Sequence, residues 1–147
     1  MRHQVQVPLK VDRVATERNV KKMLDLARDY ICMGFHPGIE AKTTAHPLPV
    51  PFSKTNRFQS GTEQAAVRNA AMEQERSAHV QQVIAAVRRL GTREQELILA
   101  RWFGADDRTD VETYIQLNMT HASYYRTRSR AFYKLAFALG VEVYEEE

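Results

Sequence analysis

The sequence contains one cysteine, Cys32, in 147 residues. An intramolecular disulfide is therefore excluded, and a cysteine-based metal site would lack its other ligands. Because Cys32 falls among the apolar positions of a helical pattern, we interpret it as a small packed hydrophobe rather than a reactive thiol. The sequence also lacks an apolar run near the ~20 residues that cross a bilayer, and its N-terminus has no apolar signal-peptide core. These absences predict a protein of the reducing cytoplasm that does not enter a membrane.

Motifs that carry catalysis are missing too. There is no glycine-rich phosphate loop and no nucleophile elbow. Asp106 and Asp107 are adjacent, so their carboxylates diverge instead of converging on a substrate. The histidines are scattered and belong to no metal-ligand spacing: His3, His36, His46, His79 and His121. We therefore predict that the protein is not an enzyme and uses no metal or other cofactor.

Charge is distributed unevenly along the chain. The formal net charge is only +3, which does not identify a nucleic-acid partner by itself. No Asp or Glu occurs between Thr113 and Val141, although that stretch contains four basic residues: Arg126, Arg128, Arg130 and Lys134. A segment without carboxylates suits a partner rich in phosphates, because carboxylates facing phosphates would be costly. The acidic tail that follows either increases solubility or competes with that partner for the basic segment: Glu142, Glu145, Glu146 and Glu147.

Apolar residues recur with helical spacing over most of the chain, and no sustained two-residue alternation indicates a strand, so we predict an all-α fold. The first helix is expected from about residue 11 to 33, with Asp12 or Thr16 as its N-cap. Its inward stripe consists of Val20, Leu24, Ala27 and Ile31. Four prolines then break the helical pattern: Pro37, Pro47, Pro49 and Pro51. The sequence thus divides into an N-terminal helical segment (1–34), a proline-rich connector (35–61) and a C-terminal helical domain (62–147).

The C-terminal domain is expected to begin with a long helix that reaches about residue 90. Ser60 and Glu63 have the spacing of a capping box. The second half of this helix has a clear apolar stripe: Val80, Val83, Ile84, Val87 and Leu90. Its first half is polar, which indicates that it projects from the core or pairs with another chain. We predict that Gly91 ends the helix in a left-handed cap, and that Thr92 and Gln95 form the capping box of the next helix, at about 93–103.

Two further helices are predicted at about 110–117 and 121–139. Asn118 and Met119 make a tight turn between them, Thr120 is the N-cap of the second helix, and Gly140 ends it. This layout is that of a helix-turn-helix, whose second helix enters the major groove with its N-terminal part. On a helical wheel, five residues form the inward stripe of that helix: Tyr124, Thr127, Ala131, Leu135 and Ala138.

The rest of the last helix supplies the candidate DNA-binding residues: His121, Ala122, Ser123, Tyr125, Arg126, Arg128, Arg130 and Lys134. Arg126 is the strongest candidate for a base contact, since a guanidinium can bond guanine O6 and N7 together. His121 and Tyr125 are expected to read base edges or to pack on the sugar–phosphate backbone. The other basic residues are expected to meet phosphates, which set affinity and register without reading sequence: Arg128, Arg130 and Lys134. The predicted partner is double-stranded DNA.

The segment from Leu90 to Gly140 resembles region 4 of the bacterial sigma-70 family. In that family a helix like that at 93–103 packs on a helix-turn-helix, and the last helix closes with an Ala-Leu-x-x-Leu-type pattern. Here the residues at the position of this pattern are Ala131-Phe132-Tyr133-Lys134-Leu135. By position, the resemblance implies DNA contacts from His121, Ala122, Tyr125, Arg126 and Arg130. His121 and Ala122 replace a charged pair often found there, so the resemblance does not imply an operator sequence.

The last predicted helix contains the segment Ser123-Tyr124-Tyr125-Arg126-Thr127-Arg128-Ser129-Arg130-Ala131-Phe132. Most specifically in this segment, the whole chain resembles the ArpU family of phage-encoded transcriptional regulators. Looser matches are the helical segment at 17–24, the proline-rich middle, and the helix that contains Leu97 and Ile98. The resemblance implies a sequence-specific regulator of late packaging and lysis genes in a phage or prophage, acting in the cytoplasm of the bacterial host.

Two other classes fit parts of this pattern. A small DNA-packaging subunit of a phage also uses helix-turn-helix domains and helical oligomers. A sigma-like module would bind RNA polymerase without independent DNA affinity, and Trp102 and Phe103 would be its anchors. We predict instead that the rings of Trp102 and Phe103 pack in the core of the helical bundle. For the DNA-binding class we expect a homo-oligomer, assembled through the N-terminal helix and the polar half of the long helix, because one recognition helix reads few base pairs.

Overall fold

The computed structural model describes residues 9–34 and 60–146, which form five α-helices and no strand. The helices are α1 (Arg13–Cys32), α2 (Ser60–Arg88), α3 (Thr92–Trp102), α4 (Asp110–Gln116) and α5 (His121–Leu139). The predicted all-α class is confirmed over these residues. The proline-rich connector up to residue 59, together with His3, His36 and His46, lies outside the described residues. No helix in the described part of the chain is long and apolar enough to span a bilayer.

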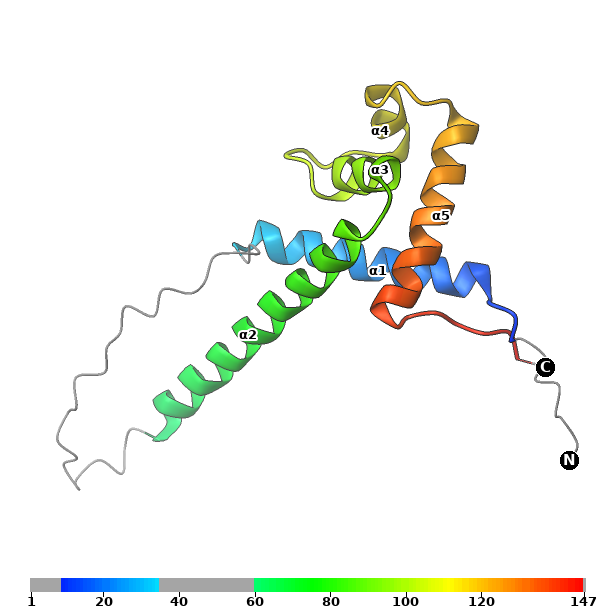
Figure 1. Cartoon of the computed structure of the whole chain (residues 1–147). Helices are drawn as coiled ribbons and strands as arrows, with labels where there is room; N and C mark the ends of the chain where they lie inside the picture. The colour runs from blue at the N-terminus through cyan, green and yellow to red at the C-terminus, as the bar shows by residue number, and fades with distance from the viewer. Residues whose placement is uncertain (1–8, 35–59, 147) are drawn as a thin grey trace, which may run out of the picture.

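The helices share one hydrophobic core. Figure 1 shows α5 standing beside α3 and α4, with α1 crossing its lower end, while α2 runs away from the other helices. Side chains from four helices meet in a single cluster, among them Val20 and Leu24 of α1, Val83 and Val87 of α2, Leu97 and Ile98 of α3, and Phe132 and Leu135 of α5. The N-terminal helix α1 is thus part of the same core as the C-terminal helices.

Trp102 joins α1 to α3. Its ring is 1% exposed, its indole Nε1 donates to Asp25 Oδ1 at 2.9 Å, and its carbonyl accepts from Arg28 Nη1 at 2.7 Å. The core position favoured for this residue is confirmed. Because the indole is enclosed and its N–H is already paired, Trp102 does not form a surface anchor.

Local helix signals are confirmed at three helix ends. Asp12 caps α1 by accepting from the Ala15 backbone N–H at 3.1 Å, and Thr120 caps α5 by accepting from the Ser123 N–H at 3.2 Å. α5 ends before Gly140 as predicted, and Gly140 has a left-handed φ of +67°. Each signal needs only residues within one turn of the helix end, which explains why the sequence reveals them.

The prediction that Gly91 ends α2 in a left-handed cap is wrong. Its φ of −62° and ψ of 159° are extended, and it is the N-cap of α3 rather than the end of α2. The Gly91 N–H donates to Glu94 Oε2 at 3.2 Å, so Glu94 replaces Gln95 in the predicted capping interaction and Thr92 is already helical. At the other end of α2, Ser60 is the first helical residue and not the cap.

Two predictions of burial are wrong. Cys32 is exposed, because it lies about five turns after the outward-facing Val14 on the same side of α1. Ala138 on α5 is exposed while Ala136 is fully buried, so the inward face of α5 is turned relative to the predicted stripe.

Candidate nucleic-acid interface

Local hydrogen bonds hold the short α4 helix and the turn that follows it. Thr109 Oγ1 accepts from the Glu112 N–H at 3.2 Å, and Glu112 Oε2 accepts from the Thr109 N–H at 3.0 Å. The chain then reverses through Asn118, whose φ of 53° is left-handed. This conformation suits asparagine better than most residues. The Met119 N–H returns to the Tyr114 carbonyl at 2.9 Å, and α5 begins two residues later.

A part-buried hydrogen bond fixes α5 against α4 and α3. Tyr124 is 0% exposed, and its hydroxyl donates to Asp110 Oδ1 at 2.6 Å. Arg101 Nε on α3 donates to the same oxygen at 3.2 Å. Burial of the ring, followed by the hydrogen bond to Asp110, raises the pKa of Tyr124 above its ordinary value. Three helices are therefore tied together beneath the N-terminal half of α5.

Aromatic rings surround the start of α5. The His121 ring centroid lies 4.6 Å from that of Tyr125 and 5.9 Å from that of Tyr114. Tyr124 continues the cluster, with centroids 5.2 Å from Tyr125 and 5.6 Å from Tyr114. These contacts restrict the exposed His121 ring to a defined position at the first turn. No spacing rule in the sequence predicts that Tyr114, in a different helix, supports it.

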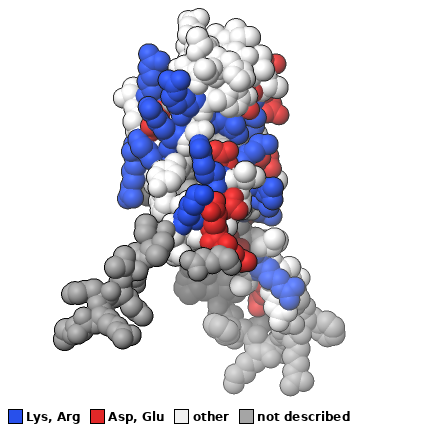
Figure 2. Space-filling view, turned by 90° about the vertical axis from the view of Figure 1, so that its right-hand side faces the viewer, with Lys and Arg blue, Asp and Glu red and all other residues white. Residues whose placement is uncertain are grey.

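The exposed face of α5 carries three of the predicted basic residues, Arg126, Arg130 and Lys134. Ala122, Arg126 and Arg130 are exposed and lie four residues apart, so they follow one side of the helix. Neither arginine makes an ion pair within the described residues. Figure 2, which views the molecule from the α5 side, shows many Lys and Arg side chains at the left of its upper part, while several Asp and Glu side chains lie lower. Ser123 is half-buried beside this face.

Arg128 and Lys134 contact other parts of the protein. The Arg128 guanidinium lies 4.6 Å from the Phe132 ring centroid and 5.7 Å from that of Tyr125. Its Nε is buried and has no hydrogen-bond partner in the described part of the chain. Lys134 Nζ lies 3.0 Å and 2.9 Å from the two carboxylate oxygens of Glu94 on α3. The structure thus groups Ala122, Arg126 and Arg130 on one face and gives these two cations contacts within the fold.

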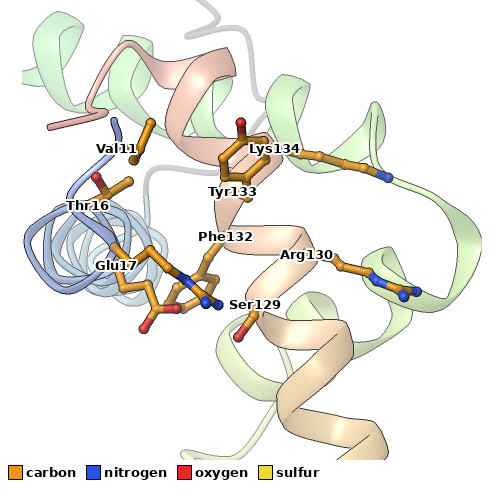
Figure 3. Close-up of a pocket in the computed structure, with 9 residues that line it drawn as sticks. Val11, Thr16, Glu17, Ser129, Arg130, Phe132, Tyr133 and Lys134 are labelled. Carbon is orange, nitrogen blue, oxygen red and sulfur yellow. The ribbon is translucent and has the colours of Figure 1, made fainter. Parts of the chain in front are cut away.

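A groove separates the basic face from the start of α1. Its volume is about 380 Å³, and Val11, Phe132 and Tyr133 supply apolar lining. Figure 3 shows Thr16 and Glu17 on the α1 side of this groove, whereas the side chains of Arg130 and Lys134 extend away from α1. The groove therefore offers apolar surface beside the basic face. Among the described residues, no group of three or more His, Cys, Asp or Glu is placed to hold a metal ion.

The acidic tail lies beside the N-terminal end of α1 and not beside the N-terminal half of α5. The Asp12 N–H donates to the Val143 carbonyl at 2.8 Å, and the Glu145 N–H donates to the Lys10 carbonyl at 2.7 Å. Thr16 Oγ1 accepts from the Val143 N–H at 3.0 Å and donates to the Val143 carbonyl at 3.3 Å. Residues 141–145 are thus held beside the N-terminal end of α1.

These features define an all-helical protein in which part-buried hydrogen bonds hold one basic helix with its outer face toward solvent. The chain is similar to an uncharacterized phage-related protein of Listeria innocua, with 27% identity over 135 residues, 90% of this chain and 92% of the relative. This similarity supports a phage protein. No family model matches the chain. No solved structure matches it either.

Proposed function

We propose that the protein is a sequence-specific DNA-binding regulator of phage or prophage late genes, of the ArpU type, acting in the cytoplasm of a bacterial host. The observation that carries the proposal is the exposed face of α5, where Arg126 and Arg130 lie beside the small Ala122 on a helix without carboxylates. The similarity to a phage-related protein supports the biological setting. The sigma-like helix-turn-helix at α4 and α5 is part of this proposal.

The proposed mechanism places the N-terminal half of α5 in the major groove. Arg126 bonds guanine O6 and N7, and the Ala122 methyl group allows close approach and contact with a thymine methyl. Arg130, one turn further along, meets a phosphate. His121 and Tyr125 contact base edges or the backbone from the first two turns. Ser123, half-buried at the first turn, contributes a hydroxyl to the same end of the helix.

Arg128 and Lys134 contribute to DNA binding mainly by positioning α5. Lys134 pairs with Glu94 at 2.9 Å, and a phosphate contact would have to compete with that pair. Arg128 is stacked on Phe132, so its side chain is already ordered before any partner binds. Their direct phosphate contacts stay a prediction, which the dependence of affinity on salt concentration tests.

A sigma-like module that binds RNA polymerase is the second candidate. Val111 and Ile115 on α4 are 49% and 64% exposed, and their spacing of four residues puts them on one side of that helix. In this candidate the pair would be buried against the polymerase. The buried Trp102 gives this candidate no support.

The proposed function is tested by binding to a library of DNA fragments at two salt concentrations. The wild type is compared with Arg126→Ala and with Arg18→Ala, which removes an exposed arginine from α1 instead. We expect the wild type and Arg18→Ala to enrich the same motif, and Arg126→Ala to lose selectivity because alanine cannot bond a base edge. Absence of any enriched motif, or identical behaviour of the Arg126 variant, would overturn sequence reading by α5. A pull-down with RNA polymerase then tests the second candidate.

A further inference from the structure

The N-terminal half of α2 extends beyond every helix that packs on it. Contacts to α1 begin at Arg76, whose guanidinium lies 5.9 Å from the Tyr30 ring, and continue at His79, which meets Tyr30 edge-on at 5.6 Å. Val80 is the first fully buried residue of α2. All residues from 62 to 75 are exposed, and Figure 1 shows this half running away from the other helices. At 1.5 Å per residue the exposed part is roughly 20 Å long.

An isolated helix of this length is marginally stable in water, and residues 62–75 are exposed, so packing adds little to the backbone hydrogen bonds of this half of α2. Its apolar side chains are also unprotected, since Val67 is 69% and Met72 is 49% exposed. Helical stability in proteins comes mostly from packing of one face. A partner surface would therefore explain why this segment is helical as far as Ser60.

The sequence of this half has a narrow seam with coiled-coil spacing. Steps of three and four residues connect Gln64, Val67, Ala71, Gln74 and Ala78. The small alanines allow two helices to approach closely. Arg68 and Glu75 follow Val67 and Gln74 directly and are seven residues apart, so both flank the seam on the same side.

These charges select the partner and its direction. In an antiparallel pair of two α2 helices with the two-fold axis near Ala71, Arg68 of each copy faces Glu75 of the other. The isologous contact then contains two equivalent Arg68–Glu75 pairs, one on each side of the two-fold axis. A parallel pair would instead place Arg68 near Glu63 and leave Glu75 without a partner across the seam.

We propose that α2 forms an antiparallel homodimer with a second copy of this chain through the seam from Gln64 to Ala78. The two cores then lie at opposite ends of the paired helices, each presenting its own α5. The use of these two α5 helices for two half-sites rests on the proposed function, whereas the dimer itself forms without DNA.

Charge reversal tests the dimer in full-length protein. Sedimentation equilibrium is expected to show a dimer for the wild type. Arg68→Glu and Glu75→Arg are each expected to weaken dimerisation about tenfold, since each turns two attractive pairs into repulsive ones. The double variant Arg68→Glu/Glu75→Arg restores the wild-type constant. A monomeric wild type, or rescue by Arg68→Glu/Glu63→Arg in place of the Glu75 partner, would overturn the antiparallel pairing.

Cross-linking tests the position of the two-fold axis independently. In a Cys32→Ser background, Ala71→Cys is expected to form a disulfide-linked dimer under mild oxidation. Ala85→Cys is the matched control, because it is also exposed on α2. Its copy would lie roughly 40 Å away in the antiparallel dimer. Cross-linking at Ala85 and not at Ala71 contradicts the proposal. A dimer that binds no DNA motif overturns the proposed function and leaves the pairing of α2 standing.

Discussion

Tyr124 on α5 and Asp110 on α4 are joined by a hydrogen bond of 2.6 Å at the base of the exposed basic face. The Tyr124 ring is fully buried, whereas Arg126, two residues further along the same helix, is exposed. The inner side of α5 therefore fixes the helix and its outer side is left to contact a partner. Changes on the two sides are expected to separate stability from binding.

Removal of the Tyr124 hydroxyl tests the structural side. Tyr124→Phe keeps the ring and removes one of the two hydrogen bonds that Asp110 Oδ1 accepts within residues 9–34 and 60–146, so we expect the free energy of unfolding to fall by about 1–2 kcal/mol. Tyr125→Phe is the control, because no hydrogen bond of the Tyr125 hydroxyl is found among the described residues. Urea denaturation measures both variants. Equal stability of the two would show that the Asp110 contact contributes little.

The same hydroxyl predicts a loss of stability in alkali. Burial and the Asp110 contact raise the pKa of Tyr124, so the folded protein holds this proton more tightly than the unfolded chain. The unfolded tyrosine ionises near pH ~10. Above that pH the unfolded state binds fewer protons than the folded state, and the free energy of unfolding falls as pH rises. Urea titrations from below to above this pH should show a smaller decline for Tyr124→Phe than for the wild type, and equal declines would contradict the assignment.

The ion pair between Lys134 and Glu94 predicts an asymmetric pair of variants. Glu94 is almost buried, with an 11% exposed side chain, and its carboxylate accepts from both Lys134 and the Gly91 N–H. Lys134→Met leaves this carboxylate without its cation, so we expect a loss of about 1–3 kcal/mol in the free energy of unfolding. Lys134→Met/Glu94→Gln removes the charge while keeping an acceptor for Gly91, and should recover part of the loss. A double-mutant cycle by urea denaturation measures the coupling, and additive effects would rule it out.

The sequence is most informative where the determining contacts are local. Asp12, Thr120 and Gly140 are predicted correctly because a cap depends on neighbours within one turn. The inward stripe of α1 and the apolar stripe in the second half of α2 are predictable for a similar reason, since burial repeats with the helical period. Val20, Leu24, Val80 and Val83 are all fully buried.

Features that depend on distant or competing contacts are not predictable in this way. Lys134 and Glu94 are 40 residues apart, and no spacing rule links them. Gly91 lies between α2 and α3, and a glycine at this position is compatible with either the end of α2 or the start of α3. Ala136 and Ala138 have the same side chain, so only the position of α5 against its neighbours determines which one is buried.

Gly91, which precedes α3, and Gly140, which follows α5, predict opposite responses to substitution. Gly91 has an ordinary φ of −62°, and a Cβ would lie 3.6 Å from Glu94 Oε2, an ordinary contact. Gly91→Ser adds a capping oxygen and should raise the free energy of unfolding by roughly a few tenths of a kcal/mol. Gly140 has φ +67°, so Gly140→Ala should lower the free energy of unfolding by about 1–2 kcal/mol despite open space around its Cα. Thermal or urea unfolding of both variants checks the contrast, which fails if Gly91→Ser is the more damaging.

Arg130 predicts a change in the salt dependence of DNA affinity. As the proposed phosphate contact, it should release about one counterion on binding. Arg130→Gln is therefore expected to weaken binding to all sequences alike and to reduce the slope of log affinity against log salt concentration by roughly one unit. Arg18→Gln is the control, since it removes an exposed charge from α1 and should leave the slope unchanged.

Comparison of Arg130→Gln with Arg126→Ala distinguishes a residue that contacts a phosphate from one that contacts a base. If Arg126 bonds a base, Arg126→Ala reduces the ratio of specific to nonspecific affinity. If Arg130 bonds only a phosphate, Arg130→Gln leaves that ratio nearly constant. Fluorescence anisotropy with a selected and a scrambled DNA fragment, each over a range of salt concentrations, gives both quantities. If Arg130→Gln changes the ratio and leaves the slope intact, Arg130 reads bases, and the reading part of α5 extends a full turn further than proposed.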